Sequence, residues 1–327
     1  MMATVIDAAM RGQLVERRHR LESVVGARDD AAQLRELLED VDAALARMDE
    51  GTFGVCEVCR GTVEAERLLA DPLVSVCLGC MTPAQVHALE QDLELAASIQ
   101  AGLLPCRDTK HDGWQVSYHY EAASLVSGDY CDLVTADDGQ LYFMLGDVAG
   151  KGVAAALLMS QLHAMFRSLI PVGLPLNQLV ERASRVFCES TLSTHYATLV
   201  CGRADESGAV EICNAGHLPP LLLRRGDATL IEATGLPVGI FCNEQFTSSG
   251  FRMQPGETLF LFTDGLSESR DPAGEEYTTE RLLSLLCQHQ ELLPGELIGA
   301  CLRDLADFSA GTPKHDDLTV MALRRTN

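Results

Sequence analysis

Four short acidic segments could do chemistry, because each places an aspartate beside glycine or a polar turn at the end of an apolar, strand-like run. They span 127–132, 146–152, 263–265 and 315–319, and their leading acidic residues are Asp129, Asp147, Asp264 and Asp316. Hard cations such as Mg²⁺ and Mn²⁺ bind carboxylates, backbone carbonyls and water. One Asp-Gly motif alone is usually only a turn. Four such motifs at strand ends predict a shared metal site.

A second set of metal ligands lies nearer the N-terminus. Two C-x2-C pairs, Cys56/Cys59 and Cys77/Cys80, are separated by seventeen residues. Each pair directs two thiolates at one point, and two pairs complete the tetrahedral shell of zinc. Because a four-thiolate shell leaves no open position, we expect one structural Zn²⁺ without a chemical role. Four unrelated buried cysteines remain the alternative interpretation.

The other cysteines are scattered, mostly among apolar neighbours. We interpret these eight as small buried hydrophobic residues: Cys106, Cys131, Cys188, Cys201, Cys213, Cys242, Cys287 and Cys301.

The elements that must position these residues begin with a helical N-terminal part. Residues 1–50 have helical periodicity. They predict either a short hairpin, with a break at Gly26 and an N-cap at Asp29 or Asp30, or one interrupted surface helix. Residues 51–81 form the compact cysteine-bearing module.

A change of pattern follows the module. Residues 82–105 form a linker helix that Pro83 opens and Pro105 ends. From 106 to 327, short strand-like runs alternate with helical segments, the clearest of which are 152–169, 175–191, 279–289 and 294–308. Grouped helices among many strands favour a mixed α/β sandwich over a regular βαβ array.

Composition limits the partners. At 327 residues the chain exceeds the usual size of one core, so two or three domains are expected. A formal net charge of -22 argues against nucleic acid or an anionic membrane as the main partner. We find no apolar run of about 18 residues and no signal-peptide pattern. These features predict a cytosolic (cytoplasmic) protein.

The order of the motifs resembles one known family. Five motifs carry the resemblance: Val-Ser-Gly-Asp-Tyr-Cys-Asp, Gly-Asp-Val-Ala-Gly-Lys-Gly, Asn-Ala-Gly-His-Leu-Pro-Pro, Phe-Thr-Asp-Gly-Leu-Ser-Glu and His-Asp-Asp-Leu-Thr-Val. They are similar to those of the SpoIIE/RsbU branch of the PPM (PP2C-like) phosphatases. Residues 93–105 also resemble the helix that leads into RsbU-type domains. The resemblance covers about 90–325 and implies a β-sandwich flanked by helical pairs, with a two-metal site at one end.

The resemblance implies a role for each motif. Asp147 would bridge two Mn²⁺ or Mg²⁺ ions, and the carbonyl of Val148 would complete the shell of one. Three residues would hold the other ion: Asp129, Asp264 and Asp316. Asp132 and Asp317 would support these ligands or bind through water. Two such ions lower the pKa of a shared water and neutralise charge on a phosphoryl group, so the implied activity is hydrolysis of phosphoserine or phosphothreonine in proteins.

Two positions depart from the family pattern, and two histidines stand beside the motifs. Ser127 replaces a glycine that the family often has, and Lys151 replaces a frequent histidine. Lys151 would either lie near the phosphate or be a solvated residue at a helix start. His217 is expected to have a hydrogen-bonded structural role. His315 would either support the neighbouring aspartate or be an exposed turn residue.

The cysteine module resembles the DksA/TraR zinc-finger family, whose members bind RNA polymerase through a preceding helical hairpin. The linker helix would either dock on the phosphatase core or form a homodimer. By resemblance, the expected partner is a phosphorylated STAS-domain anti-anti-sigma factor in a partner-switching pathway. Two alternatives remain: a catalytically weak phosphatase-fold scaffold, and a DksA-like regulator that binds RNA polymerase.

Overall fold

The computed structural model describes residues 2–25, 32–191, 195–314 and 316–326. It contains two compact units, Met1–Asp92 and Leu93–Asn327, whose boundary falls inside the predicted linker. Two residue groups named above lie outside the described residues: the proposed break at Gly26 with its N-cap at Asp29 or Asp30, and His315.

The N-terminal unit holds two packed helices and the cysteine module. Helices α1 (Met2–Val25) and α2 (Ala32–Asp49) share a small core that includes Leu14, Val41 and Leu45. The module contains α3 (Ala65–Ala70) and a 3-10 turn at Leu78–Cys80. Helix α4 (Pro83–Leu103) follows without interruption and runs across the boundary between the units.

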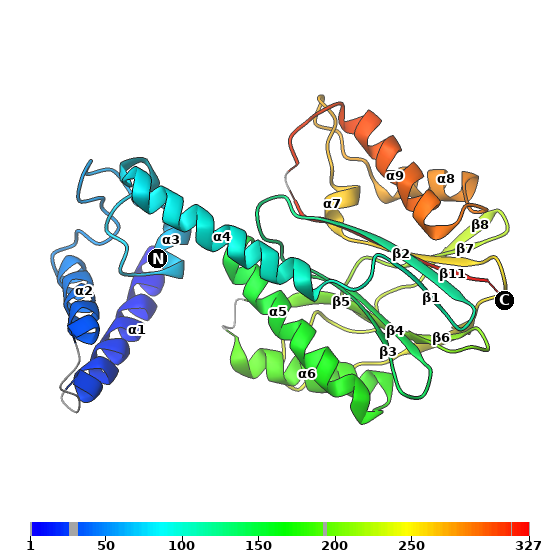
Figure 1. The fold of residues 1–327 in the computed structure, drawn as a ribbon, viewed down its shortest axis with the longest axis horizontal. Coiled ribbons are helices and arrows are strands. Elements are labelled where there is room, and N and C mark those ends of the chain that lie inside the picture. Colours follow the sequence, from blue (N-terminus) through cyan, green and yellow to red (C-terminus); the bar gives the residue numbers. More distant parts are fainter. Residues whose placement is uncertain (1, 26–31, 192–194, 315, 327) are drawn as a thin grey trace. The chain divides into compact units, whose positions relative to one another are not determined.

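The C-terminal unit is a sandwich of two antiparallel sheets (Figure 1). One has the order β1-β2-β11-β10-β7-β8, with bounds Asp108–His111, Trp114–Glu121, Leu318–Arg325, Thr258–Phe262, Leu221–Arg224 and Asp227–Leu230. The other has the order β3-β4-β5-β6-β9, with bounds Asp129–Thr135, Leu141–Val148, Ala197–Ala204, Ala209–Ala215 and Ser249–Arg252. Apolar side chains of both sheets meet between them in one core cluster.

Helices cover the outer faces of both sheets, as Figure 1 shows. Helices α5 (Gly152–Leu169) and α6 (Leu176–Ser190), joined by a 3-10 turn at Ile170–Val172, pack on the β3–β9 sheet. Helices α8 (Thr279–Gln288) and α9 (Pro294–Ser309) pack on the other, where the short α7 (Asp264–Ser267) follows β10. The predicted α/β sandwich with flanking helical pairs is confirmed.

Among the residues that the structure describes, one stretch, Gly152–Val172, is long and apolar enough to cross a membrane by length and composition alone. It consists of α5 and the following turn, and its buried residues include Met159, Leu162 and Phe166. These residues belong to the core cluster beneath the helix. One face of this stretch therefore packs on a sheet.

The cysteine interpretation is wrong in part. Cys188 near the end of α6 forms a disulfide with Cys242, 54 residues away, and Cys106 is an exposed free thiol. Cys287 is partly exposed. The expectation of buried hydrophobic residues is confirmed for Cys131, Cys201, Cys213 and Cys301. The error arose because a pairing between distant segments leaves no local pattern in a sequence.

Candidate functional site

The four leading aspartates come from strand ends that meet at one end of the sandwich. Asp129 opens β3 and lies directly opposite Asp147, near the end of β4. Asp264 opens α7 just after β10, and Asp316 stands just before β11, the neighbour of β10. Antiparallel pairing therefore places two of them on each sheet.

Hydrogen bonds to Asp129 join the two sheets at this end. Its carboxylate is almost fully buried, and Oδ2 accepts hydrogen bonds from Thr263 Oγ1 at 3.0 Å and Thr319 Oγ1 at 2.5 Å. Burial raises the pKa of Asp129 well above its usual range, and the charges of Asp147 and Asp317 raise it further. The two threonines oppose this rise because they stabilise the carboxylate.

Asp147 lies where the negative charges converge. Its burial, followed by the charges of Asp264, Asp316 and Asp317, raises its pKa to about 7. Burial and the charge of Asp316 also raise the pKa of Asp264. Carboxylates that repel one another in a partly buried site are the donor set that a divalent cation neutralises.

Gly128 leaves space beside two of the proposed ligand atoms. A Cβ at this position would lie 3.1 Å from the carbonyl oxygen of Val148 and 3.5 Å from Asp147 Oδ1. Both oxygens therefore border the same small space, and any larger residue would fill it. This geometry fits the pairing of the Asp147 carboxylate with the Val148 carbonyl on one ion.

The aspartates do not form a closed ligand shell. Among the described residues, the cysteine set is the one acidic, thiol or imidazole group of three or more whose ligand atoms all lie within 4.8 Å of one another. Mg²⁺ usually keeps several of its waters and takes only one or two carboxylates. The spread of the carboxylates is therefore compatible with ions that keep water ligands, as hydrolysis requires.

Asp317 and Asp316 already have protein partners. Asp317 accepts hydrogen bonds from the backbone N–H of Ala123 and of Gly128, both at 2.8 Å, and so fixes the loop before β3. Asp316 Oδ2 lies 2.9 Å from the ammonium of Lys151, which is the residue before α5. Lys151 is thus paired with a proposed metal ligand, although its side chain is 66% exposed.

Asp132 lies apart from the other aspartates. It is fully buried, and the guanidinium of Arg167 in α5 holds both of its oxygens, at 2.8 and 2.5 Å. Alternate residues of a strand point to opposite faces, so Asp132 faces α5 whereas Asp129 faces the other sheet. The motif therefore places the two residues close in sequence but on different sides of β3.

His217 is buried in the network behind the aspartates. Its Nδ1 lies 2.8 Å from Thr198 Oγ1, its Nε2 lies 3.1 Å from the carbonyl oxygen of Phe262, and its backbone N–H donates to Asn214 Oδ1. Burial lowers its pKa to about 4, so the imidazole is neutral near pH 7. The expected hydrogen-bonded structural role is confirmed.

The sequence analysis did not single out several residues that bond to the acidic segments or to His217: Thr198, Thr263, Thr319, Arg167 and Gln100. Thr263 and Thr319 do flank the acidic motifs, at Thr-Asp-Gly and Asp-Leu-Thr. A threonine within two residues of a motif aspartate was a usable sequence signal for these two. The other three act on segments far away in sequence, which no local motif reveals.

The four module cysteines come together as predicted. Their sulfurs all lie within 4.8 Å of one another, and Cys59 and Cys77 Sγ are 3.7 Å apart. Backbone N–H groups of Cys59 and Cys77 lower the pKa of Cys56 to about 6, which favours a thiolate at this position. Hydrogen bonds with Cys59 and Cys77 raise the pKa of Cys80 to about 12, and burial raises that of Cys77, so these thiols would lose their protons only to a bound metal. The interpretation as four unrelated buried cysteines is therefore wrong, and the donor set fits a tetrahedral zinc.

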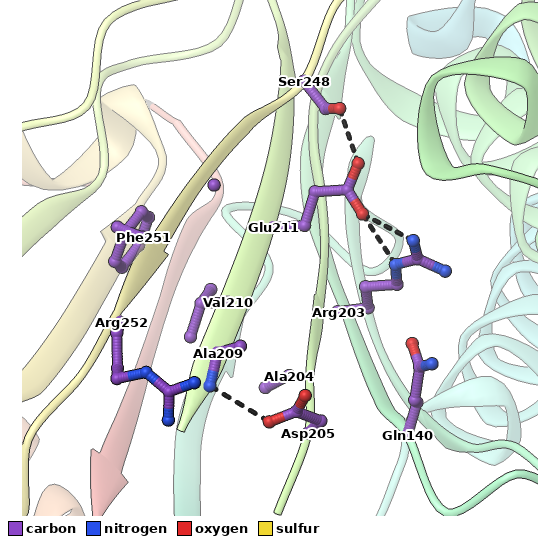
Figure 2. Close-up of a pocket in the computed structure, with 11 residues that line it drawn as sticks. Gln140, Arg203, Ala204, Asp205, Ala209, Val210, Glu211, Ser248, Phe251 and Arg252 are labelled. Carbon is purple, nitrogen blue, oxygen red and sulfur yellow. Dashed lines mark hydrogen bonds and ion pairs between the residues drawn. The ribbon is translucent and has the colours of Figure 1, made fainter. Parts of the chain in front are cut away.

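The described part of the C-terminal unit contains a groove beside the acidic segments and a second hollow away from them. A groove of about 660 Å³ borders Asp316 and Gly265, and α9 contributes apolar Leu302 and Leu305 to its lining. The other hollow, of about 630 Å³, lies over β5, β6 and β9 and is shown in Figure 2. There Glu211 joins Arg203 and Ser248, so these polar groups already have partners. Of the two, the groove adjoins a proposed ligand, Asp316.

Comparison with known proteins gives several matches. Protein IcfG of Synechocystis is 28% identical over 72% of this chain and 41% of its own length. Phosphoserine phosphatase RsbU of Bacillus subtilis is 26% identical over 78% of each chain. The crystal structure of the RsbU and RsbW domains of Rv1364c from Mycobacterium tuberculosis superposes with a TM-score of 0.57 at 27% identity, covering 68% of this chain and 63% of that one. The chain thus spans less than half of IcfG.

The cysteine module has a relative of its own. The RNA polymerase-binding transcription factor DksA of Haemophilus influenzae is 33% identical over 53 residues, which is 16% of this chain and 37% of DksA. With the four-cysteine cluster, this match supports a DksA-like zinc finger in the N-terminal part.

The model of the family described as Stage II sporulation protein E (SpoIIE) matches residues 137–326, more than half of the chain. The β-sandwich with flanking helical pairs agrees with that match, which contains three of the four acidic segments, 146–152, 263–265 and 315–319. The chain therefore belongs to the SpoIIE family of PPM-type phosphatases.

Proposed function

We propose that this protein removes phosphate from phosphoserine or phosphothreonine in a protein substrate, with Asp129, Asp147, Asp264 and Asp316 as metal ligands. One observation supports this most strongly: Asp147 is partly buried where carboxylates from both sheets converge, and its burial, followed by the charges of Asp264, Asp316 and Asp317, raises its pKa to about 7. Two bound Mn²⁺ or Mg²⁺ ions would supply a hydroxide from water for in-line attack on phosphorus.

The chain's own residues would hold the ions and keep their ligands oriented. The Asp147 carboxylate and the Val148 carbonyl border the same space beside Gly128 and would together bind one ion. Thr263 and Thr319 restrain Asp129 so that its carboxylate keeps one orientation. Preorganised ligands of this kind cost little reorganisation when the phosphoryl group reacts.

We further propose that the substrate is a phosphorylated STAS-domain anti-anti-sigma factor in a partner-switching pathway. The relative RsbU is named a phosphoserine phosphatase, and the Rv1364c structure joins RsbU and RsbW domains. The groove beside Asp316 is large enough to accept a polypeptide segment next to the phosphorylated residue. The charge of -22 favours a protein over a nucleic acid as the partner.

One assay tests the enzyme proposal. Wild-type protein should hydrolyse p-nitrophenyl phosphate with Mn²⁺, and Asp147→Ala and Asp264→Ala should each lose this activity. Asp137→Asn is the matched control, because Asp137 is an exposed aspartate in the turn after β3. Hydrolysis that persists in both alanine variants would exclude the proposed site. An inactive wild type, also towards a phosphorylated STAS protein, would favour the scaffold function.

A second assay tests the zinc assignment. We propose one structural Zn²⁺ per chain on Cys56, Cys59, Cys77 and Cys80, and elemental analysis should find it in the purified protein. Cys59→Ser should lower the zinc content, whereas Cys106→Ser, at an exposed free thiol, should not. Equal zinc content in both variants would contradict the assignment. If the module binds RNA polymerase in a pull-down, the DksA-like function gains support.

The linker helix carries a separate proposal, a homodimer. Val86 and Leu89 of α4 are exposed, as are Leu95 and Ile99. Exposed apolar side chains along one helix suit a partner helix. Leu93, which is half-buried, lies one turn beyond Leu89 on the same stripe of the helix. Leu89→Glu together with Leu93→Glu should convert a dimer to a monomer in light scattering, and an unchanged mass would contradict the dimer.

A further inference from the structure

Helix α4 buries one polar residue among its described side chains. Gln100 is 6% exposed, whereas the other residues of the helix are exposed or half-buried. Glutamine is seldom buried, because each of its amide atoms loses water and must find another partner. The partners of Gln100 therefore indicate why α4 has a glutamine at this position.

Both ends of the Gln100 amide bind the backbone of one residue, Ser127. Its Nε2 donates to the carbonyl oxygen of Ser127 at 2.7 Å, and its Oε1 accepts from the backbone N–H of Ser127 at 3.0 Å. A single side chain thus satisfies both backbone groups of a residue that belongs to no helix or strand. The Gln100 amide thus pairs with the backbone N–H and C=O of Ser127 as a neighbouring strand in a sheet would.

Ser127 is the first residue of the segment that carries Asp129, a proposed metal ligand. Its Oγ accepts a hydrogen bond from the backbone N–H of Asp129 at 3.0 Å, and the next N–H, of Gly128, is held by Asp317. The loop before β3 is therefore held on one side by α4 and on the other by the residue before β11. Gly128 between them borders the oxygens of Asp147 and Val148.

We propose that Gln100 is a positioning residue through which helix α4 sets the conformation of the loop that carries Asp129. The inference rests on the proposed function, because it assumes that Asp129 and Asp147 bind metal. If Gln100 releases Ser127, both backbone groups of Ser127 lose their partner and the loop loses its restraint on one side. The site would then bind its ions more weakly, although its ligands are intact.

Two measurements on the full chain test this inference. Gln100→Leu keeps a similar side-chain size and removes both hydrogen bonds. In metal-free protein it should speed hydrogen exchange in peptides that cover 122–129, and calorimetry should show Mn²⁺ affinity about tenfold weaker, the lower end for loss of a partner behind a ligand. Ser98→Ala is the control, because Ser98 is exposed on the same helix.

A second variant keeps the test valid if Gln100→Leu does not fold. Gln100→Glu retains an acceptor for the N–H of Ser127 but has no donor for its carbonyl, so its exchange should be intermediate. Wild-type exchange and Mn²⁺ affinity in Gln100→Leu would overturn the inference. Weakened affinity that tracks only a lower melting temperature, with unchanged exchange at 122–129, would also overturn it.

Failure of the proposed function has a different signature. A wild type that binds Mn²⁺ without hydrolysing p-nitrophenyl phosphate would refute the enzyme proposal, while weaker Mn²⁺ binding by Gln100→Leu would still support the inference. An active wild type with an unaltered Gln100→Leu variant would refute the inference alone.

Discussion

His217 donates a hydrogen bond from Nε2 to the carbonyl oxygen of Phe262, 3.1 Å away, because a carbonyl can only accept. Its Nδ1 then accepts from the hydroxyl of Thr198, which lies directly opposite Asp147 in the β4–β5 pair. Phe262 is the last residue of β10, two positions before Asp264. One neutral imidazole therefore joins the two sheets behind the proposed ligands.

Replacement of His217 should weaken both the fold and the site. His217→Ala leaves the half-buried hydroxyl of Thr198 and the Phe262 carbonyl without this partner, so the free energy of unfolding should fall by about 1–3 kcal/mol. Urea denaturation measures this loss, and Mn²⁺ titration should show weaker binding. His87→Ala, at an exposed histidine, is the control. Wild-type stability in His217→Ala would show that the bridge contributes nothing.

The metal-free protein should lose stability as the pH rises. The pKa of Asp147 is about 7 in the folded chain against a usual value of 3.8. Between these values the folded chain holds a proton that the unfolded chain has released, so the free energy of unfolding falls with rising pH. Mn²⁺ affinity should increase over the same range, because the ion displaces that proton.

The Asp147→Asn variant isolates this titration. Asparagine has no proton to hold, so the difference in unfolding free energy between wild type and variant should change between about pH 4 and about pH 7. Urea denaturation at several pH values, with a chelator present, measures it. Parallel curves for the two proteins would contradict the raised pKa.

Lys151 should compete with metal for Asp316. Its ammonium lies 2.9 Å from Asp316 Oδ2, an atom that a bound cation would also need. Lys151→Met keeps the length of the side chain but removes the charge, so less Mn²⁺ should be needed for half-maximal hydrolysis. A fall in kcat at saturating Mn²⁺ would instead indicate that Lys151 acts on the phosphate. Mn²⁺ titrations of the rate separate the two results.

Reduction of the Cys188–Cys242 disulfide should destabilise the C-terminal unit. Closing a chain segment of 54 residues lowers the entropy of the unfolded state, which amounts to about 4 kcal/mol in the loop-closure model. Urea denaturation of wild type and of the Cys188→Ala/Cys242→Ala double variant should differ by up to this amount, and peptide mapping should find the bond. Cys106→Ala is the control. Equal stability of the double variant and wild type would contradict a role for the bond.

Local patterns predicted much of this molecule. The helix expected at 152–169 is α5 residue for residue, and the one expected at 294–308 ends one residue early. Periodicity and punctuation by proline or glycine act within one segment, so sequence alone can reveal them. The two C-x2-C pairs could also be recognised from sequence alone, because the spacing within each pair directs two thiolates at one point.

Contacts between distant segments could not be predicted. Asp129 and Asp132 share one motif, but strand alternation directs Asp132 to Arg167 and Asp129 to the threonines of the other sheet. The pairing of Gln100 with Ser127 likewise depends on where α4 ends against the loop. Such relations depend on tertiary packing, which a single sequence does not encode in any local signal.

The pairing of β2 with β11 also has a kinetic consequence. These strands are neighbours in the sheet, yet Ala123 and Asp317, which bond just beyond their ends, are separated by 194 residues. Contacts of such long range form late and slowly, because the chain must first close a large loop. Asp317 reaches Ala123 and Gly128 only when this loop closes. We therefore expect the metal site to assemble only after this long-range pairing has formed, so partly folded chains that lack it should be unable to bind the ions.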